Sequence, residues 1–239
     1  MQGLKTKKFA LPCSLSFSYK LFIMNCLVVS ATAIEINPFL DQWRTNKISF
    51  PGHEIDILVS GIGLTATTYS LTRHLQLKRP DLIIQAGIAG CYDKNIPLGS
   101  VLAIKQETIG DQCVIESGKL KTMFDLDLVT ESQLPYSKGW LINKTEFLKK
   151  LNLKKVKAIS VNEITTSRQK IKLYSEKFGP VVESMEGAAL HYVCGMEKIP
   201  FIQLRSVSNY IGERNKKNWN IKESIINLNK ELTRLLETL

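Results

Sequence analysis

The stretch that decides the fold of this 239-residue chain is residues 181–210, VVESMEGAALHYVCGMEKIPFIQLRSVSNY. Val181 and Val182 predict the end of a short strand, and residues 201–207 predict a mostly buried strand. Between them, residues 183–197 repeat apolar side chains at helical spacing, and Pro200 ends that helix. The repeated residues, which predict one buried helix face, are Met185, Ala188, Ala189, Tyr192, Val193 and Met196.

Polar side chains occupy the junctions of this strand, helix and strand. Glu186 falls in the first turn of the predicted helix, and Ser208 and Asn209 fall where the second strand ends and the chain turns. Ligands of open α/β sheets bind at the carboxyl ends of strands. Glu186 and Asn209 are therefore candidate ligand-binding residues.

The same alternation of strands and helices continues through the rest of the chain. No Pro-, Gly- or Ser-rich linker and no internal repeat interrupts it. The pattern predicts a single α/β domain at 24–239, built on a central mixed, mostly parallel sheet flanked by helices. Further strands are predicted at 26–30, 48–50, 55–60, 82–86, 100–107 and 157–161, helices at 35–44, 64–77, 144–151, 168–178 and 222–236, and irregular structure at 109–139.

The N-terminus allows two interpretations. Residues 1–20 are basic, residues 21–33 are apolar, and Ala31-Thr32-Ala33 resembles a signal-peptidase site, which would indicate export. Alternatively, residues 26–30 form the first buried strand behind a dispensable extension at 1–23. The odd number of cysteines, five, favours this second interpretation and a cytoplasmic protein. No apolar stretch reaches transmembrane length, so no membrane association is expected.

Charge and composition argue against several classes of function. The net charge of +10 suits a nucleic-acid surface, but the lysines clustered at 144–157 have no interleaved aromatic residues, so we expect no nucleic-acid binding. The cysteines form no CxxC pair and the three histidines are isolated, so neither a metal nor a cofactor is expected. Gly61-Ile62-Gly63 outlines a dinucleotide fingerprint, but the acidic residue expected after the next strand is missing.

Two further positions suit a small-molecule site. Glu35 follows the first strand, where an acid is also favoured simply by the start of a helix. Gly87-Ile88-Ala89-Gly90 is predicted as a turn of small residues after a strand, which allows a ring or a sugar to lie close to the backbone.

Five segments in order and spacing, LVVSATAIEI, LVSGIGLTA, LIIQAGIAG, VESMEGAA and LRSVSN, resemble the purine nucleoside phosphorylase and nucleosidase superfamily. The resemblance extends from about residue 24 to the C-terminus, and it is greatest to the futalosine hydrolases of menaquinone biosynthesis. It implies a purine nucleoside as small-molecule substrate. Because relatives complete their sites with a neighbouring subunit, it also implies a homo-oligomer.

The resemblance also implies residue roles. Glu35 would activate water, while Met185 and Glu186 would hold the ribose. Asn209 stands where adenine-releasing nucleosidases have an aspartate that protonates the base. Residues of the small-residue turn, Ile88, Ala89 and Gly90, and more loosely Thr166, would contact the substrate.

Two departures from the superfamily pattern narrow the expected chemistry. An amide at Asn209 donates to a 6-oxo group and accepts from N7–H, which favours hypoxanthine over adenine as the departing base. Phosphorylases carry an Arg and a Ser or Thr where Gln85 and Ile88 stand, so water is the expected nucleophile. The alternatives are a methylthioadenosine/S-adenosylhomocysteine nucleosidase, a phosphorylase, and a non-catalytic nucleoside-binding protein.

Overall fold

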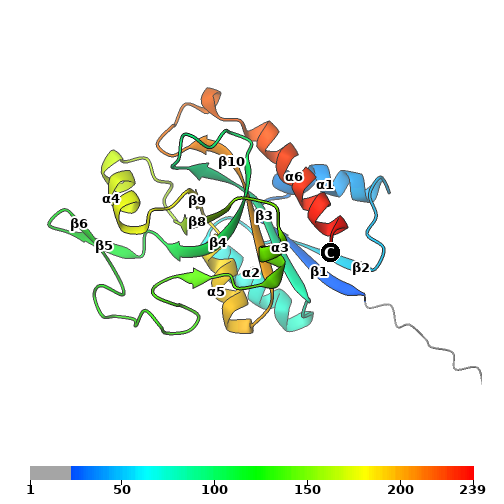
Figure 1. Ribbon diagram of the computed structural model, residues 1–239, viewed down its shortest axis with the longest axis horizontal. Helices are drawn as coiled ribbons and strands as arrows, with labels where there is room; N and C mark the ends of the chain where they lie inside the picture. Colours follow the sequence, from blue (N-terminus) through cyan, green and yellow to red (C-terminus); the bar gives the residue numbers. More distant parts are fainter. Residues whose placement is uncertain (1–22) are drawn as a thin grey trace, which may run out of the picture.

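The computed structural model describes residues 23–239, so the predicted extension at 1–23 lies, apart from Ile23, outside the described residues. A mixed sheet lies between two helical layers, with α1 and α6 on one face and α2 and α5 on the other (Figure 1). The strands are β1 (Met24–Ser30), β2 (His53–Val59), β3 (Leu82–Cys91), β4 (Val101–Ile109), β7 (Leu141–Ile142), β8 (Lys155–Ser160), β9 (Val182–Ser184) and β10 (Phe201–Tyr210). The helices are α1 (Ala33–Arg44), α2 (Leu64–Leu77), α3 (Glu146–Lys150), α4 (Arg168–Phe178), α5 (Gly187–Glu197) and α6 (Ile221–Glu237).

The strands follow the order β10-β4-β8-β9-β3-β1-β2, and β7 pairs with β4. Because β10 also pairs with β3, the strands β10, β4, β8, β9 and β3 form a closed ring. The pairs β1–β2, β1–β3, β3–β10, β4–β8 and β8–β9 are parallel, and the others are antiparallel. This confirms the predicted α/β class with a mixed, mostly parallel sheet.

Strand β1 shows why the sheet is covered on both faces. Its side chains alternate, so Cys26 and Val28 pack in the core with α1 and α6, while Leu27 and Val29 pack with α2 and α5. All four are fully buried. The interpretation of 26–30 as a buried strand is confirmed. Within residues 23–239 no helix is long and apolar enough to cross a membrane.

The structure differs from the sequence-based predictions at the elements that carry the site. The predicted turn at 87–90 is wrong, because β3 continues to Cys91, with Gly90 paired to both Glu183 and Asn209. Asn209 likewise lies within β10 and not after it. Glu183 belongs to β9, so helix α5 starts only at Gly187 and Glu186 is its N-cap residue.

Three other predictions also need correction. Residues 48–50 form no strand. The segment 109–139 contains a hairpin of β5 (Cys113–Glu116) and β6 (Lys119–Thr122). The predicted buried face of the helix at 183–197 is wrong at Tyr192 and Met196, which are 36% and 50% exposed, because the neighbouring Leu190, His191 and Cys194 face the core instead.

Candidate active site

A pocket of about 330 Å³ opens at the carboxyl ends of β1, β9 and β10, beside β3. Seven of the eight predicted site residues line it: Glu35, Ile88, Ala89, Gly90, Met185, Glu186 and Asn209. Thr166 does not. It lines a neighbouring hollow with Lys94 and Arg168, and Ile164 lines the pocket in its place.

Glu35 is held rigidly at one side of this pocket. It lies in the first turn of α1 and is 8% exposed. Its Oε2 accepts hydrogen bonds from the Ser30 hydroxyl at 3.2 Å and from the Thr32 N–H and hydroxyl, both at 3.1 Å. Its Oε1 accepts the Ile88 N–H at 3.0 Å. With two backbone donors fixing it, the carboxylate is positioned to accept a proton from a bound molecule.

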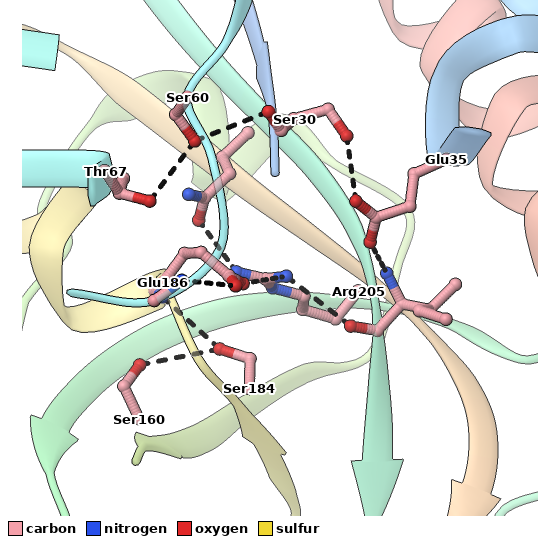
Figure 2. A network of polar contacts seen from close by, with 12 residues as sticks. Ser30, Glu35, Ser60, Thr67, Ser160, Ser184, Glu186 and Arg205 are labelled. Carbon is pink, nitrogen blue, oxygen red and sulfur yellow. Dashed lines mark hydrogen bonds and ion pairs between the residues drawn. The ribbon is translucent and has the colours of Figure 1, made fainter. Parts of the chain in front are cut away.

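Glu186 lies opposite, beside a buried cation. Its Oε1 accepts the Gly63 N–H at 3.2 Å, and its Oε2 pairs with Arg205 Nη1 at 3.2 Å. Arg205 is 1% exposed; it also donates to Gln85 Oε1 at 3.0 Å. Figure 2 shows the Arg205 guanidinium between the Glu186 and Glu35 side chains. A buried pair of this kind is held by its surrounding hydrogen bonds, since desolvation alone would disfavour it.

Gly87 explains how these groups come so close. A Cβ at this position would lie 2.4 Å from Arg205 Nη1 and 3.1 Å from Glu35 Oε1. A glycine is therefore required to admit both side chains over strand β3. The small-residue segment serves the packing of charged groups as well as the approach of a ligand.

Asn209 presents a defined amide to the pocket. Its Oδ1 accepts the Ser208 hydroxyl at 2.9 Å, and its Nδ2 donates to the Tyr210 carbonyl at 3.2 Å. An amide has two acceptor lone pairs and two N–H donors. One acceptor and one donor therefore stay free for a bound molecule.

The remaining pocket wall is largely apolar. Six isoleucines and one tryptophan line it, namely Ile34, Ile62, Ile164, Ile211, Ile221, Ile225 and Trp219. Ile34 and Ile62 are 68% and 61% exposed. The pocket thus combines a polar floor with apolar walls, which is typical of small-molecule sites.

Two charged residues at the site, Arg205 and Glu183, were not predicted from the sequence. Arg205 stands in the LRSVSN segment, and its signal was a charge inside an otherwise apolar strand. Glu183 also lines the pocket, where its carboxylate accepts the Thr165 N–H at 3.0 Å and the Tyr92 hydroxyl at 2.7 Å. Among residues 23–239, no group of three or more His, Cys, Asp or Glu is arranged to hold a metal ion.

The sequence profile of the phosphorylase superfamily matches residues 28–239. The chain belongs to the phosphorylase superfamily. Among curated superfamily members, it is 26% identical to the 5′-methylthioadenosine/S-adenosylhomocysteine nucleosidase of Buchnera aphidicola over 79% of this chain and 80% of the relative. It is 25% identical to the futalosine hydrolase of Streptomyces coelicolor over 90% of this chain and 97% of the relative.

Solved structures of superfamily members share the fold. The futalosine hydrolase of Helicobacter pylori gives a TM-score of 0.73 at 18% identity, covering 91% of this chain and 99% of the other. The 5′-methylthioadenosine/S-adenosylhomocysteine nucleosidase of the same organism, solved with butyl-thio-DADMe-Immucillin-A, gives 0.74 at 18% identity, covering 91% and 100%. Both groups of relatives are nucleosidases, so the prediction of an enzyme of the N-glycosyl hydrolase class is confirmed.

Proposed function

We propose that this chain hydrolyses the N-glycosidic bond of a 6-oxopurine nucleoside, and that its substrate is futalosine, with hypoxanthine as the released base. The observation that carries the proposal is the amide of Asn209 in a pocket shared with Glu35 and Glu186. The free donor of the amide suits a 6-oxo group, and its free acceptor suits N7–H. Adenine offers the opposite pattern and would gain no proton from an amide.

Each residue then has a defined role. Glu186, with Met185 against the sugar face, binds the ribose hydroxyls. Water attacks C1′ as the bond to the base breaks, and the bonding electron pair leaves with the base. Glu35 takes the proton from the water, while the base gains a proton at N7 from solvent and keeps it hydrogen-bonded to Asn209. General-base assistance of this kind contributes about 10²- to 10⁴-fold.

Water is favoured over phosphate by the charges around Arg205. This side chain is a buried cation behind the pocket-lining Glu186, but Glu186 and Gln85 already bind both of its terminal nitrogens. A phosphate dianion would have to displace a carboxylate and would face Glu35 as well. Ile88 stands among these groups without a hydroxyl to offer. Neutral water neither has to displace the Glu186 carboxylate nor is repelled by Glu35.

The decisive experiment offers futalosine, inosine and methylthioadenosine to the purified protein in phosphate-free buffer. Chromatography identifies the released base. We expect hypoxanthine from futalosine, with no rate increase when phosphate is added. Preferential release of adenine from methylthioadenosine would instead favour the adenine-releasing nucleosidase, which the identity to such relatives keeps as the second candidate.

We also propose that the enzyme is a homo-oligomer. Val59 at the end of β2, Ile62 in the following connection and Tyr69 on α2 are 47%, 61% and 64% exposed, and Ile62 lines the pocket. A second copy covering these side chains would also narrow the pocket mouth. Light scattering after size exclusion tests this, and a monomer at micromolar concentration would contradict it.

A further inference from the structure

Behind Glu186 lie four buried polar residues: Glu107, Ser160 and Gln203, against which the start of helix α5 packs, and His191 of α5 itself. We call them the α5 polar cluster. None is more than 2% exposed, and none of them lines the pocket. Glu107, Ser160 and Gln203 come from β4, β8 and β10, so three strands converge on the start of α5.

A continuous hydrogen-bonded path connects Glu107 to that turn. The Ser160 hydroxyl donates to Glu107 Oε1 at 2.9 Å and accepts the Ala188 N–H at 2.8 Å. The Gly187 N–H reaches the Ser184 hydroxyl at 3.3 Å, and Ser184 lies 3.5 Å from Ser160 (Figure 2). Two of the N–H groups that a helix start leaves without helical partners are thus bound by side chains of β8 and β9.

The contact is close enough to set the position of α5. A Cβ on Gly187 would lie 2.6 Å from Glu107 Oε2 and 2.3 Å from Gln203 Nε2. Glu107 Oε2 and both polar atoms of the Gln203 amide make no hydrogen bond within the described residues. The cluster therefore has unused hydrogen-bonding capacity directly against the residue that follows Glu186.

We propose that Glu107 is a positioning residue for Glu186, acting through Ser160 and the N-terminus of α5. Glu186 is the N-cap residue of that helix, so a displacement of the first turn moves its carboxylate relative to Arg205 and the pocket. This inference rests on the proposed role of Glu186 in holding the ribose. Glu107 touches no substrate.

The charge of Glu107 gives the path a pH dependence. Burial raises the pKa of Glu107 to about 7, the nearby Glu186 carboxylate adds to the rise, and Ser160 and Arg205 oppose it. The ionisable groups around it are Arg205 on β10, Glu186 at the N-cap and His191 on α5; burial lowers the pKa of His191 to about 4, so this side chain is neutral at pH 7. Above pH 7, ionised Glu107 places a second negative charge near the Glu186 carboxylate, which the single charge of Arg205 must then balance.

Calorimetric binding of two ligands tests the inference in the full chain. The first is 9-deazainosine, a carbon-linked nucleoside that has no N-glycosidic bond to hydrolyse, and the second is hypoxanthine, which lacks the ribose. Ser160→Ala and Glu107→Ala should bind the nucleoside about tenfold more weakly, the equivalent of one lost hydrogen bond, with hypoxanthine affinity unchanged. Ser224→Ala, which removes a buried hydroxyl bonded to the Val207 carbonyl at 2.7 Å, is the matched control and should change neither affinity.

Glu107→Gln separates positioning from charge. Its amide oxygen still accepts from Ser160, so nucleoside affinity at pH 6 should equal that of the wild type. The wild type should weaken between pH 6 and pH 8, and this variant should not. A wild type that binds neither ligand contradicts the proposed function. A wild type that binds both, with Ser160→Ala retaining full nucleoside affinity or Glu107→Gln retaining the wild-type pH profile, overturns the inference.

Discussion

Replacing Glu35 by glutamine removes the proposed base while changing the fewest atoms. The structure shows that this change is not neutral for folding. The Glu35 carboxylate faces a backbone N–H at each oxygen, Thr32 at Oε2 and Ile88 at Oε1. In either orientation, the NH₂ of a glutamine would face one of these donors, and that N–H would lose its acceptor.

The expected size of both effects follows from these contacts. One buried donor without a partner costs about 1–3 kcal/mol of unfolding free energy. For a chain of this length, that lowers the melting temperature by roughly 2–12 °C. Turnover should fall by at least about 10²-fold, because glutamine cannot accept the proton of the attacking water. Turnover is measured as base release well below the melting temperature, and stability is measured by calorimetry.

Asp125→Asn is the control for the stability effect. Its Oδ2 accepts the Thr122 N–H and hydroxyl, both at 2.7 Å, as Glu35 does with Thr32, but Asp125 lies outside the pocket. This variant should lose stability and keep its turnover. If folded Glu35→Gln protein turns over substrate within a few-fold of the wild type, Glu35 is not the base.

Three further predictions follow from the same contacts. Asn209→Asp should raise the ratio of kcat/KM for adenine release to kcat/KM for hypoxanthine release by at least about tenfold, since a carboxylic acid can protonate N7. If chromatography shows an unchanged ratio, Asn209 does not determine the specificity for the base. Gly87→Ala should reduce turnover at least about tenfold, because its Cβ would overlap Nη1 of the fully buried Arg205 and displace that side chain from Glu186. Normal kinetics would contradict the close approach. The pKa of Glu107 is raised from an ordinary value of 4.5 to about 7, so the free energy of unfolding falls as pH rises between these values. The pKa of His191 is lowered from 6.5 to about 4, so the free energy of unfolding rises over its own range. In the wild type these two pH dependences nearly cancel. In Glu107→Gln only that of His191 remains, so its free energy of unfolding, measured with urea, should rise by about 2 kcal/mol between pH 4.5 and 6.5, while that of the wild type stays nearly constant.

The elements predicted most accurately from the sequence are those whose ends are set by capping residues next to them in the chain. Helix α4 begins and ends where expected, because Ser167 accepts the Lys170 N–H and Gly179 adopts the left-handed conformation at the C-terminus. The Ser117-Gly118 turn between β5 and β6 has positive φ angles of 49° and 75°, a hairpin signal that was available and went unused.

The wrong predictions concern segments whose structure is determined by residues far away in the sequence. Residues 48–50 have strand-forming side chains but no neighbouring strand, and Phe50 packs instead on Phe39 of α1 with ring centroids 6.0 Å apart. Strand β3 continues through the glycines because β9 and β10 pair with it on either side. Neither outcome can be deduced from propensity, since both depend on which strands become neighbours.

Arg205 shows what a physical interpretation of a single residue can still add. A guanidinium in an apolar strand costs several kcal/mol to bury unless charged and polar partners surround it. The strand's alternation places Arg205 on the same face as Gln203, two residues earlier, so one face of β10 must meet polar partners. The structure supplies Gln85 and the pocket-lining Glu186. A buried arginine between Leu204 and Ser206 therefore predicts a carboxylate facing that strand, and in a strand that leads into a candidate ligand site, it indicates where the charged floor of the pocket will lie.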